Sequence, residues 1–236
     1  MLKELKERVF KANLDLVNEG LVIHTWGNVS GRDKKSGLIV IKPSGVSYKS
    51  MKPEDMVVMD LEGKVIEGKF KPSTDAPTHL LLYKVFGPIG GIVHTHSTYA
   101  TSWAQAGKSI PPLGTTHADH YYGAVPCTRK LTGNEVNKEY EINTAKVIVE
   151  ALKGVDPLSV PSVLVNCHGP FCWGTDTEDA VYNAIALEEI ARIAFYTVLL
   201  GKKESIDQGL LDKHYNRKHG RNSYYGQTKK IKIKGK

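Results

Sequence analysis

The sequence lacks the features that would place it in a membrane, in an oxidising compartment or among nucleotide-binding enzymes. No run of about 18 apolar residues occurs, so we expect no segment that spans a bilayer. The three cysteines, Cys127, Cys167 and Cys172, are odd in number and form no Cys-x-x-Cys pair, which favours buried thiols in a reduced, cytoplasmic protein. Neither a Walker A motif nor Gly-x-Gly-x-x-Gly is present. We therefore expect neither a nucleoside triphosphate nor a nicotinamide cofactor.

The net positive charge is also small outside one short segment. The formal net charge is +7, but five lysines lie among the last eight residues, and seven minus these five leaves only +2 for the rest of the chain. No zinc-finger spacing or aromatic-studded basic motif accompanies these lysines, so we expect no nucleic-acid partner. Residues 228–236 are predicted to be a solvated, disordered tail. The N-terminal residues mix both charges with helical apolar spacing, which is unlike a signal peptide.

The 236 residues and 41% hydrophobic content suffice for one domain with a substantial core. Helical and strand patterns alternate, which predicts an α/β or α+β layered fold. Helices are expected over 2–19, from about Pro77, over 97–106 and 141–153, and after Thr175-Asp-Thr-Glu178, which has capping-box spacing. Strands are expected near 22–24, 38–41, 56–60, 64–67, before and through His94-Thr-His96, near 163–167, and as short pieces in the loop-rich stretch 107–140.

The pair His94 and His96 stands at the end of an apolar run. Alternate residues of a strand share one face, so both imidazoles point to the same side and can bind one metal ion such as zinc. The competing interpretation is a half-buried strand with a hydrogen-bonded histidine. His168 lies in a similar place, where another apolar run meets Gly169-Pro170, and three histidines at strand ends favour an open metal site.

Three polar turns offer groups that bind a small anion. One is Thr25–Ser30, with Gly27 and Asn28; the second is Lys42–Gly45, which supplies a cation, the Ser44 hydroxyl and a glycine N–H. The third, 72–77, holds Ser73, Thr74 and Asp75 at a predicted helix start, where free N–H groups attract phosphate. Each turn alone is compatible with an ordinary turn or cap. Their combination near a metal site favours a phosphorylated small molecule.

Each of three further residues allows two or more interpretations. Asp75 can cap the helix, ligate the metal or act as a base. Asp119 can form an Asx turn or take part in chemistry in a loop rich in donors. Tyr225, beside Tyr224, can be a packing aromatic or a proton-transfer group with a lowered pKa near a cation.

Together these segments resemble the class II aldolase/epimerase family, and within it the L-ribulose-5-phosphate 4-epimerases. The resemblance covers residues 1–227 as a single domain. It rests on the following segments: Thr25-Trp-Gly-Asn-Val-Ser30, Ile41-Lys-Pro-Ser-Gly45, Lys71-Pro-Ser-Thr-Asp75, Gly90-Gly-Ile-Val-His-Thr-His-Ser97, Gly114-Thr-Thr-His-Ala-Asp119, Pro126-Cys-Thr-Arg129, His168-Gly-Pro-Phe171, Asp212–Gly220 and Tyr224-Tyr-Gly-Gln227.

The resemblance implies a class II aldolase-like fold, a central, mostly antiparallel sheet flanked by helices. It implies Zn²⁺, with Mn²⁺ or Co²⁺ as alternatives, held by His94, His96 and His168 with Asp75 as a further ligand. It also implies substrate or phosphate contacts from Gly27, Asn28, Ser44, Gly45, Ser73 and Thr74. The cation of the turn Lys42–Gly45 adds Lys42 to this set. Asp119 and Tyr225 match the family's acid/base pair, with Thr115, His214 and Arg217 in support. The tyrosine is expected to reach in from a neighbouring subunit of a homotetramer whose active sites lie at subunit interfaces.

The chemistry of the implied substrate agrees with these residues. In L-ribulose 5-phosphate the C4 hydrogen is β to the C2 carbonyl, so simple deprotonation at C4 fails. Retro-aldol cleavage of C3–C4 and re-addition on the other aldehyde face gives D-xylulose 5-phosphate, and this route needs two acid/base groups on opposite faces. The alternative is a class II ketose-1-phosphate aldolase such as fuculose-1-phosphate aldolase, whose glutamate is replaced here by Asp75. A non-enzymatic sugar-phosphate-binding module is a third possibility.

Overall fold

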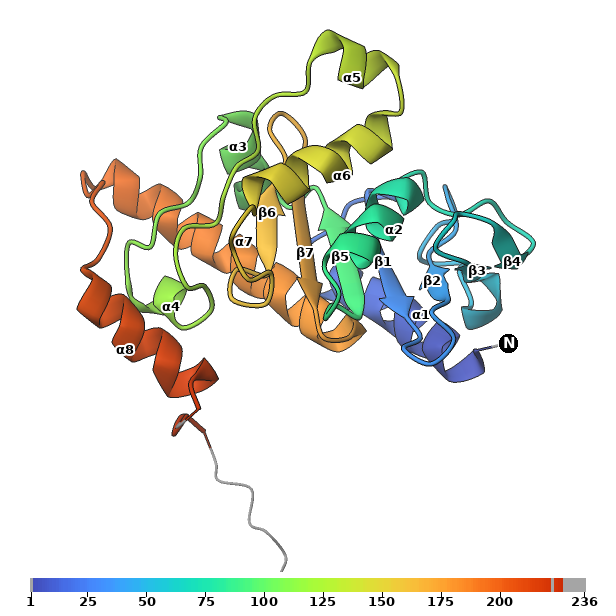
Figure 1. Ribbon diagram of the computed structural model, residues 1–236, viewed down its shortest axis with the longest axis horizontal. Coiled ribbons are helices and arrows are strands. Elements are labelled where there is room, and N and C mark those ends of the chain that lie inside the picture. Colours follow the sequence, from blue (N-terminus) through green and yellow to red (C-terminus); the bar gives the residue numbers. More distant parts are fainter. Residues whose placement is uncertain (1, 222, 227–236) are drawn as a thin grey trace, which may run out of the picture.

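A central β-sheet organises the molecule (Figure 1). The computed structural model describes residues 2–221 and 223–226, and within them the sheet has seven strands in the order β4-β3-β2-β1-β5-β7-β6. Every strand pair is antiparallel, which confirms the expected sheet type. The strands are β1 (Gly27–Arg32), β2 (Ile39–Ile41), β3 (Val57–Met59), β4 (Val65–Glu67), β5 (Gly91–Thr95), β6 (Ser162–Leu164) and β7 (Pro170–Gly174).

Helices cover both faces of this sheet (Figure 1). On one face α1 packs on β1 and the long α7 packs on β5 and β7, while α2 lies on the opposite face with α6 beside it. The helices are α1 (Lys3–Asn18), α2 (Ala76–Val85), α3 (Thr98–Gln105), α4 (Thr115–Ala118), α5 (Gly133–Asn137), α6 (Tyr140–Ala151), α7 (Thr177–Leu199) and α8 (Gln208–His219), with a short 3₁₀ turn η1 at Pro53–Asp55. Among the described residues, none of these helices has the length and apolar character needed to cross a membrane.

The alternation of side chains along β1 decides what meets each face. Val29 and Gly31 face α1 and α7: Asn13 of α1 bonds the Val29 backbone, and a Cβ at Gly31 would lie 2.8 Å from Thr177 of α7. Asn28 and Ser30 therefore face α2. Because Asn28 pairs with His94 across the sheet, the strand brings its polar side chains to the predicted histidine site.

The structure corrects several sequence-based boundaries near the N-terminal half of the site. Residues 22–24 form an irregular turn rather than a strand, and His24 adopts a left-handed backbone with φ 54°. The strand begins at Gly27 instead, inside the segment interpreted as a polar turn. Gly, Asn and Ser have low strand propensity, so only pairing with two neighbouring strands makes this segment extended.

The C-terminal boundaries also differ from the expectations. Strand β6 ends at Leu164, short of Cys167, and 107–140 contains isolated bridges and the short helices α4 and α5 rather than short strands. The helix after residue 175 is capped by Asp176, whose carboxylate accepts from the Asp179 N–H, so the capping box at Thr175 and Glu178 was wrong by one residue. Asp outcompetes a Thr one position earlier because its carboxylate suits the positive helix N-terminus.

Candidate active site

The three predicted histidines meet at one end of the sheet. His94 is near the end of β5, His96 lies just beyond it, and His168 sits in the turn between β6 and β7. Their ligand nitrogens all lie within 4.8 Å of one another, with 3.2 Å between Nε2 of His94 and Nε2 of His96. The residues needed for a metal site are thus brought together from chain positions 72 residues apart.

Neighbouring groups fix how two of these imidazoles point. Nδ1 of His94 lies 2.9 Å from the Pro170 carbonyl oxygen, to which it donates, and its ring stacks on Phe171 at 4.2 Å between centroids. The Tyr140 hydroxyl lies 3.3 Å from Nδ1 of His168. A backbone carbonyl or hydroxyl on one ring nitrogen leaves the other for a metal, the usual arrangement of metal-binding histidines.

The electrostatics keep the cluster in its metal-binding form. Burial lowers the pKa of His168 to about 3, and the neighbouring His94 and His96 contribute to that lowering. Burial and His94 also lower the pKa of His96. Neutral imidazoles are the form that divalent transition metals bind, so the lowered pKa values of His96 and His168 favour metal binding by this cluster.

Asp75 stands immediately before α2, but its carboxylate makes no capping hydrogen bond to that helix. Instead Oδ2 accepts a 2.7 Å hydrogen bond from Nδ2 of Asn28, with the Ser73 hydroxyl at 3.4 Å. The pKa of Asp75 is lowered because the nearby histidines and the Asn28 bond outweigh the effect of burial, which raises it. The ionised carboxylate thus borders the histidine cluster, and its helix-capping role is excluded.

A cavity of about 530 Å³ joins the histidines to the three predicted anion-binding turns, and we call it the histidine cavity. It is lined by Thr25, Trp26, Gly27, Asn28, Lys42, Pro43, Ser44, Gly45, Ser73, Thr74, Asp75, His94, His96 and His168. Two hydrogen bonds join the last two turns: the Ser44 N–H donates to the Lys71 carbonyl oxygen, and the Ser73 N–H donates to the Lys42 carbonyl oxygen. All the predicted metal-binding and phosphate-binding residues therefore line a single cavity.

Lys42 is the cation of this cavity and is almost wholly buried. Burial lowers its pKa to about 8. Its ammonium contacts the Pro43 carbonyl oxygen at 3.3 Å and lies 4.7 Å from the Tyr48 ring centroid. These contacts leave donor capacity, since an ammonium has three N–H groups, and an anion in the cavity would use it.

The predicted acid/base residues form a separate cluster around α8. The Asp119 carboxylate accepts from Nε of Arg217 at 2.9 Å and lies 3.0 Å from Nδ1 of His214. These hydrogen bonds, with the charge of Lys218, hold the pKa of Asp119 below its usual value against the opposing effect of burial. The carboxylate is thus ionised and held by α8 rather than by an Asx turn of its own loop.

Tyr225 belongs to the same cluster. Its ring lies 5.0 Å from the Arg217 guanidinium carbon and 4.6 Å from the Lys218 ammonium, and 61% of its surface is exposed. Thr115 opens α4, and its carbonyl accepts from the Asp119 N–H. None of these residues lines the histidine cavity, and Figure 1 shows α4 and α8 together at the left, apart from α2 and β5. Within one chain the metal residues and the acid/base residues are therefore separated.

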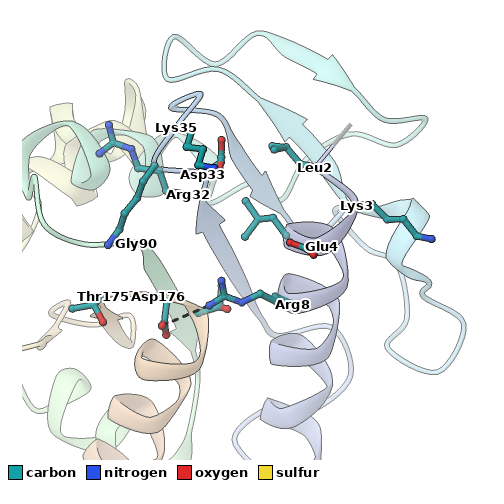
Figure 2. Close-up of a pocket in the computed structure, with 13 residues that line it drawn as sticks. Leu2, Lys3, Glu4, Arg8, Arg32, Asp33, Lys35, Gly90, Thr175 and Asp176 are labelled. Atoms are coloured by element: carbon teal, nitrogen blue, oxygen red, sulfur yellow. Dashed lines mark ion pairs between the residues drawn. The ribbon is translucent and has the colours of Figure 1, made fainter. Parts of the chain in front are cut away.

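A larger cavity of about 640 Å³ lies at the opposite end of β1 and β5 (Figure 2), and we call it the charged cavity. Its lining includes Arg8, Arg32, Lys34, Lys35 and Asp176, and no predicted site residue. Arg8 is engaged by Glu178 and lies 3.6 Å from Asp176, the ion pair drawn in Figure 2. The predicted metal-binding and phosphate-binding residues all line the histidine cavity at the other end of these strands.

Sequence reasoning did not single out Thr25, Trp26 or Pro43, which line the histidine cavity, or Tyr140, which contacts one of its histidines. From the motif that holds Thr25 and Trp26, only their neighbours were selected. Tyr140 contacts His168 from the start of α6, and nothing in its local sequence indicated this. The contact depends on the packing of α6 against α2, which no spacing rule reveals.

The chain belongs to the family described as Class II Aldolase and Adducin N-terminal domain, whose model matches residues 7–195. It is 56% identical over 227 residues to the L-ribulose-5-phosphate 4-epimerase UlaF of Salmonella paratyphi B, covering 96% of this chain and 100% of the relative. The protein of the same name from Salmonella typhi is also 56% identical, with the same coverage.

Solved structures show the same fold. An L-fuculose 1-phosphate aldolase is 27% identical with a TM-score of 0.78, covering 91% of this chain and 95% of that one. The L-fuculose-1-phosphate aldolase of Thermus thermophilus is 28% identical with a TM-score of 0.66, covering 86% of this chain and 100% of that one. The class II aldolase-like fold expected from the sequence is confirmed.

Proposed function

We propose that this chain is a metal-dependent L-ribulose-5-phosphate 4-epimerase that converts its substrate to D-xylulose 5-phosphate by retro-aldol cleavage and re-addition. The observation that carries the proposal is the histidine cavity, where a three-histidine cluster and three anion-binding turns line one space. The relatives named for this reaction, 56% identical over nearly the whole chain, support the choice of substrate.

The cofactor we propose is Zn²⁺, held by His94, His96 and His168, with Asp75 as the adjoining carboxylate. A divalent ion there supplies Lewis-acid stabilisation of the negative charge that develops on substrate oxygens when C3–C4 breaks. The residues themselves provide the ring nitrogens, and the orientations of His94 and His168 are fixed by Pro170 and Tyr140. Mn²⁺ and Co²⁺ are alternatives, because imidazole and carboxylate ligands accept them too.

The phosphate of the substrate belongs at the polar turns of the same cavity. Backbone N–H groups near Gly27 and Gly45, the hydroxyls of Ser44, Ser73 and Thr74, and the Lys42 ammonium would hold it. Fixing the phosphate retains the glycolaldehyde phosphate fragment while it rotates and presents its other face. Asn28 contacts the Asp75 carboxylate and so links the phosphate end to the metal end.

Proton transfer requires residues from outside the cavity of one chain. We assign the acid/base roles to Asp119 and Tyr225, which form one cluster with Arg217, and we propose that this cluster enters the histidine cavity of a neighbouring subunit of a homotetramer. We place the enzyme in the cytoplasm, where the thiols of Cys127, Cys167 and Cys172 stay reduced.

An assay with L-ribulose 5-phosphate and the zinc-loaded protein tests this proposal. We expect D-xylulose 5-phosphate to form without accumulation of dihydroxyacetone or glycolaldehyde phosphate. Accumulation of both fragments would instead identify an aldolase, and ligand binding without turnover would identify a binding module. Metal analysis of the same sample shows whether activity follows the zinc content.

A further inference from the structure

A line of polar side chains runs beneath the histidine cavity between β1 and α2. Asp75, His79 and Tyr83 repeat every four residues and so form one stripe along α2. They meet Asn28 and Ser30, which alternate along the facing strand β1. The contacts are Asn28 Nδ2 to Asp75 Oδ2 at 2.7 Å, Ser30 Oγ to His79 Nδ1 at 2.7 Å, and Ser30 Oγ to Tyr83 Oη at 2.9 Å.

The lower part of this line is completely removed from solvent. Ser30 and His79 have no exposed surface, and Tyr83 retains 1%. Burying polar groups between a sheet and a helix costs free energy, and apolar residues of similar size would fill the space without that cost. Because this buried polar line ends at Asp75, we look for its function at the active site.

The order of donors along the line assigns the proton on His79. Burial raises the pKa of Tyr83, so its hydroxyl stays protonated, and the backbone N–H of Ile92 is directed at its oxygen. Either hydroxyl of the Ser30–Tyr83 pair can be the donor. In the order in which Tyr83 donates to Ser30 and Ser30 donates to Nδ1 of His79, the proton of the neutral imidazole is on Nε2.

That Nε2 atom is buried and has no hydrogen-bond partner in the part of the chain that the structure describes. The imidazole is close enough to Asp75 and His94 for both to influence its pKa, which burial lowers to about 3. Asp75 precedes His79 by one helical turn, and one of its carboxylate oxygens already accepts from Asn28. A buried N–H donor without an acceptor next to a carboxylate is costly unless the carboxylate uses it in the working state.

We propose that His79 is a positioning residue: its Nε2–H holds the Asp75 carboxylate in place when the histidine cavity is loaded, with Ser30 and Tyr83 fixing the tautomer. The kinetic part of this inference rests on the function proposed above, whereas its metal-binding part does not. Groups that orient a metal site's carboxylate from behind typically affect metal affinity or activity by about 10- to 100-fold, an order-of-magnitude expectation.

Two amide substitutions separate this role from a merely structural one. In His79→Gln the amide nitrogen takes the place of Nε2, so the donor toward Asp75 is kept and the bond to Ser30 is lost. In His79→Asn the amide takes the place of Nδ1, so the bond to Ser30 is kept and the donor is lost. We expect His79→Asn to lower kcat and weaken Co²⁺ binding by about tenfold or more, with KM less affected, and His79→Gln to stay within about threefold of wild type.

The opposite order, with His79→Asn the better variant, would overturn the proposal and leave only the Ser30 contact as the role of His79. A double-mutant cycle adds a second test: on the Asp75→Asn background, His79→Asn should cause no further loss, whereas multiplied losses would mean that the two residues act independently. Should neither His79 variant fold, Tyr83→Phe serves instead, because it removes one hydroxyl and keeps the shape. A smaller loss of the same kind supports the proposal, and unchanged kcat and Co²⁺ affinity would refute it.

The two proposals can fail separately. Wild-type protein that gives no turnover with L-ribulose 5-phosphate would refute the proposed function, yet Co²⁺ titration, followed by its visible absorbance, would still rank the His79 variants. Normal wild-type turnover with indistinguishable variants would refute only the role of His79.

Discussion

The two cavities at opposite ends of β1 and β5 differ in how their charges are used. In the charged cavity the Arg8 guanidinium is paired with Glu178 and Asp176, while Nε of Arg32 is buried without a hydrogen-bond partner among the described residues. In the histidine cavity the His94 and His168 rings are held from behind by Pro170 and Tyr140, and Lys42 keeps donor capacity. The histidine cavity differs because imidazoles, a carboxylate, an ammonium and hydroxyls all line one space, where a ligand can bind several of them together.

The largest expected effect comes from removing a histidine of the cavity. His168→Ala leaves two imidazoles for the metal, and we expect loss of zinc and a fall in kcat/KM on the order of 10³-fold, since Lewis-acid stabilisation contributes several kcal/mol. Metal analysis and the epimerase assay measure this. Lys130→Ala, at an exposed residue outside the cavity lining, is the control and should keep both zinc and activity. Equal loss in both variants would contradict the assignment.

The second-largest effect is expected from the acid/base cluster, which lies in neither cavity of its own chain. Asp119→Asn and Tyr225→Phe should each lower kcat by roughly 10²- to 10⁴-fold while zinc content stays unchanged. Mixed oligomers of His168→Ala and Asp119→Asn chains should regain activity, because some sites then combine an intact metal end with an intact acid/base cluster. Absence of any recovery would mean that each site takes all its residues from one chain.

Acid should destabilise the histidine end before the charged end. Burial lowers the pKa of His79 and His168 to about 3, whereas an unfolded histidine titrates near 6.5. As pH falls below 6.5 the unfolded state binds protons that the folded state does not, so the free energy of unfolding decreases by up to about 1.4 kcal/mol per pH unit for each such histidine.

Glu178 behaves differently, because the hydrogen bond from Arg8 lowers its pKa to about 2. Its contribution is present above the ordinary value of 4.5 and is lost only as pH falls from there toward 2. Urea unfolding of the metal-free protein should therefore show a free energy of unfolding that decreases from about pH 7 to about pH 5. His79→Gln should make this decrease smaller, and Glu178→Gln should leave it unchanged. A pH-independent midpoint over this range would contradict the buried, neutral histidines.

The smallest effect is expected from the charged cavity. Lys34→Ala should change kcat/KM by no more than about twofold, as for most surface substitutions, and Arg8→Gln should cost about 0–1 kcal/mol of stability because its ion pairs are exposed. Steady-state kinetics and thermal unfolding test both. A large loss of activity in either variant would break the comparison and assign the charged cavity a function.

The sequence by itself determined most of the residues that line the histidine cavity. The His94-Thr-His96 spacing, His168 before Gly169-Pro170, and the hydroxyl- and glycine-bearing turns all occupy the cavity as expected. Such local patterns are informative because strand alternation and turn chemistry depend on residues that are neighbours in the chain.

Only the tertiary structure decided how those residues are supported and how they are divided. It turned Asp75 away from helix capping toward Asn28, placed His79 and Tyr140 behind the site, and held Asp119 with α8 at a distance from the histidines. Each of these outcomes depends on which elements pack together across many tens of residues. Packing is fixed by the burial of whole helix and strand faces, so short-range spacing carries no record of it.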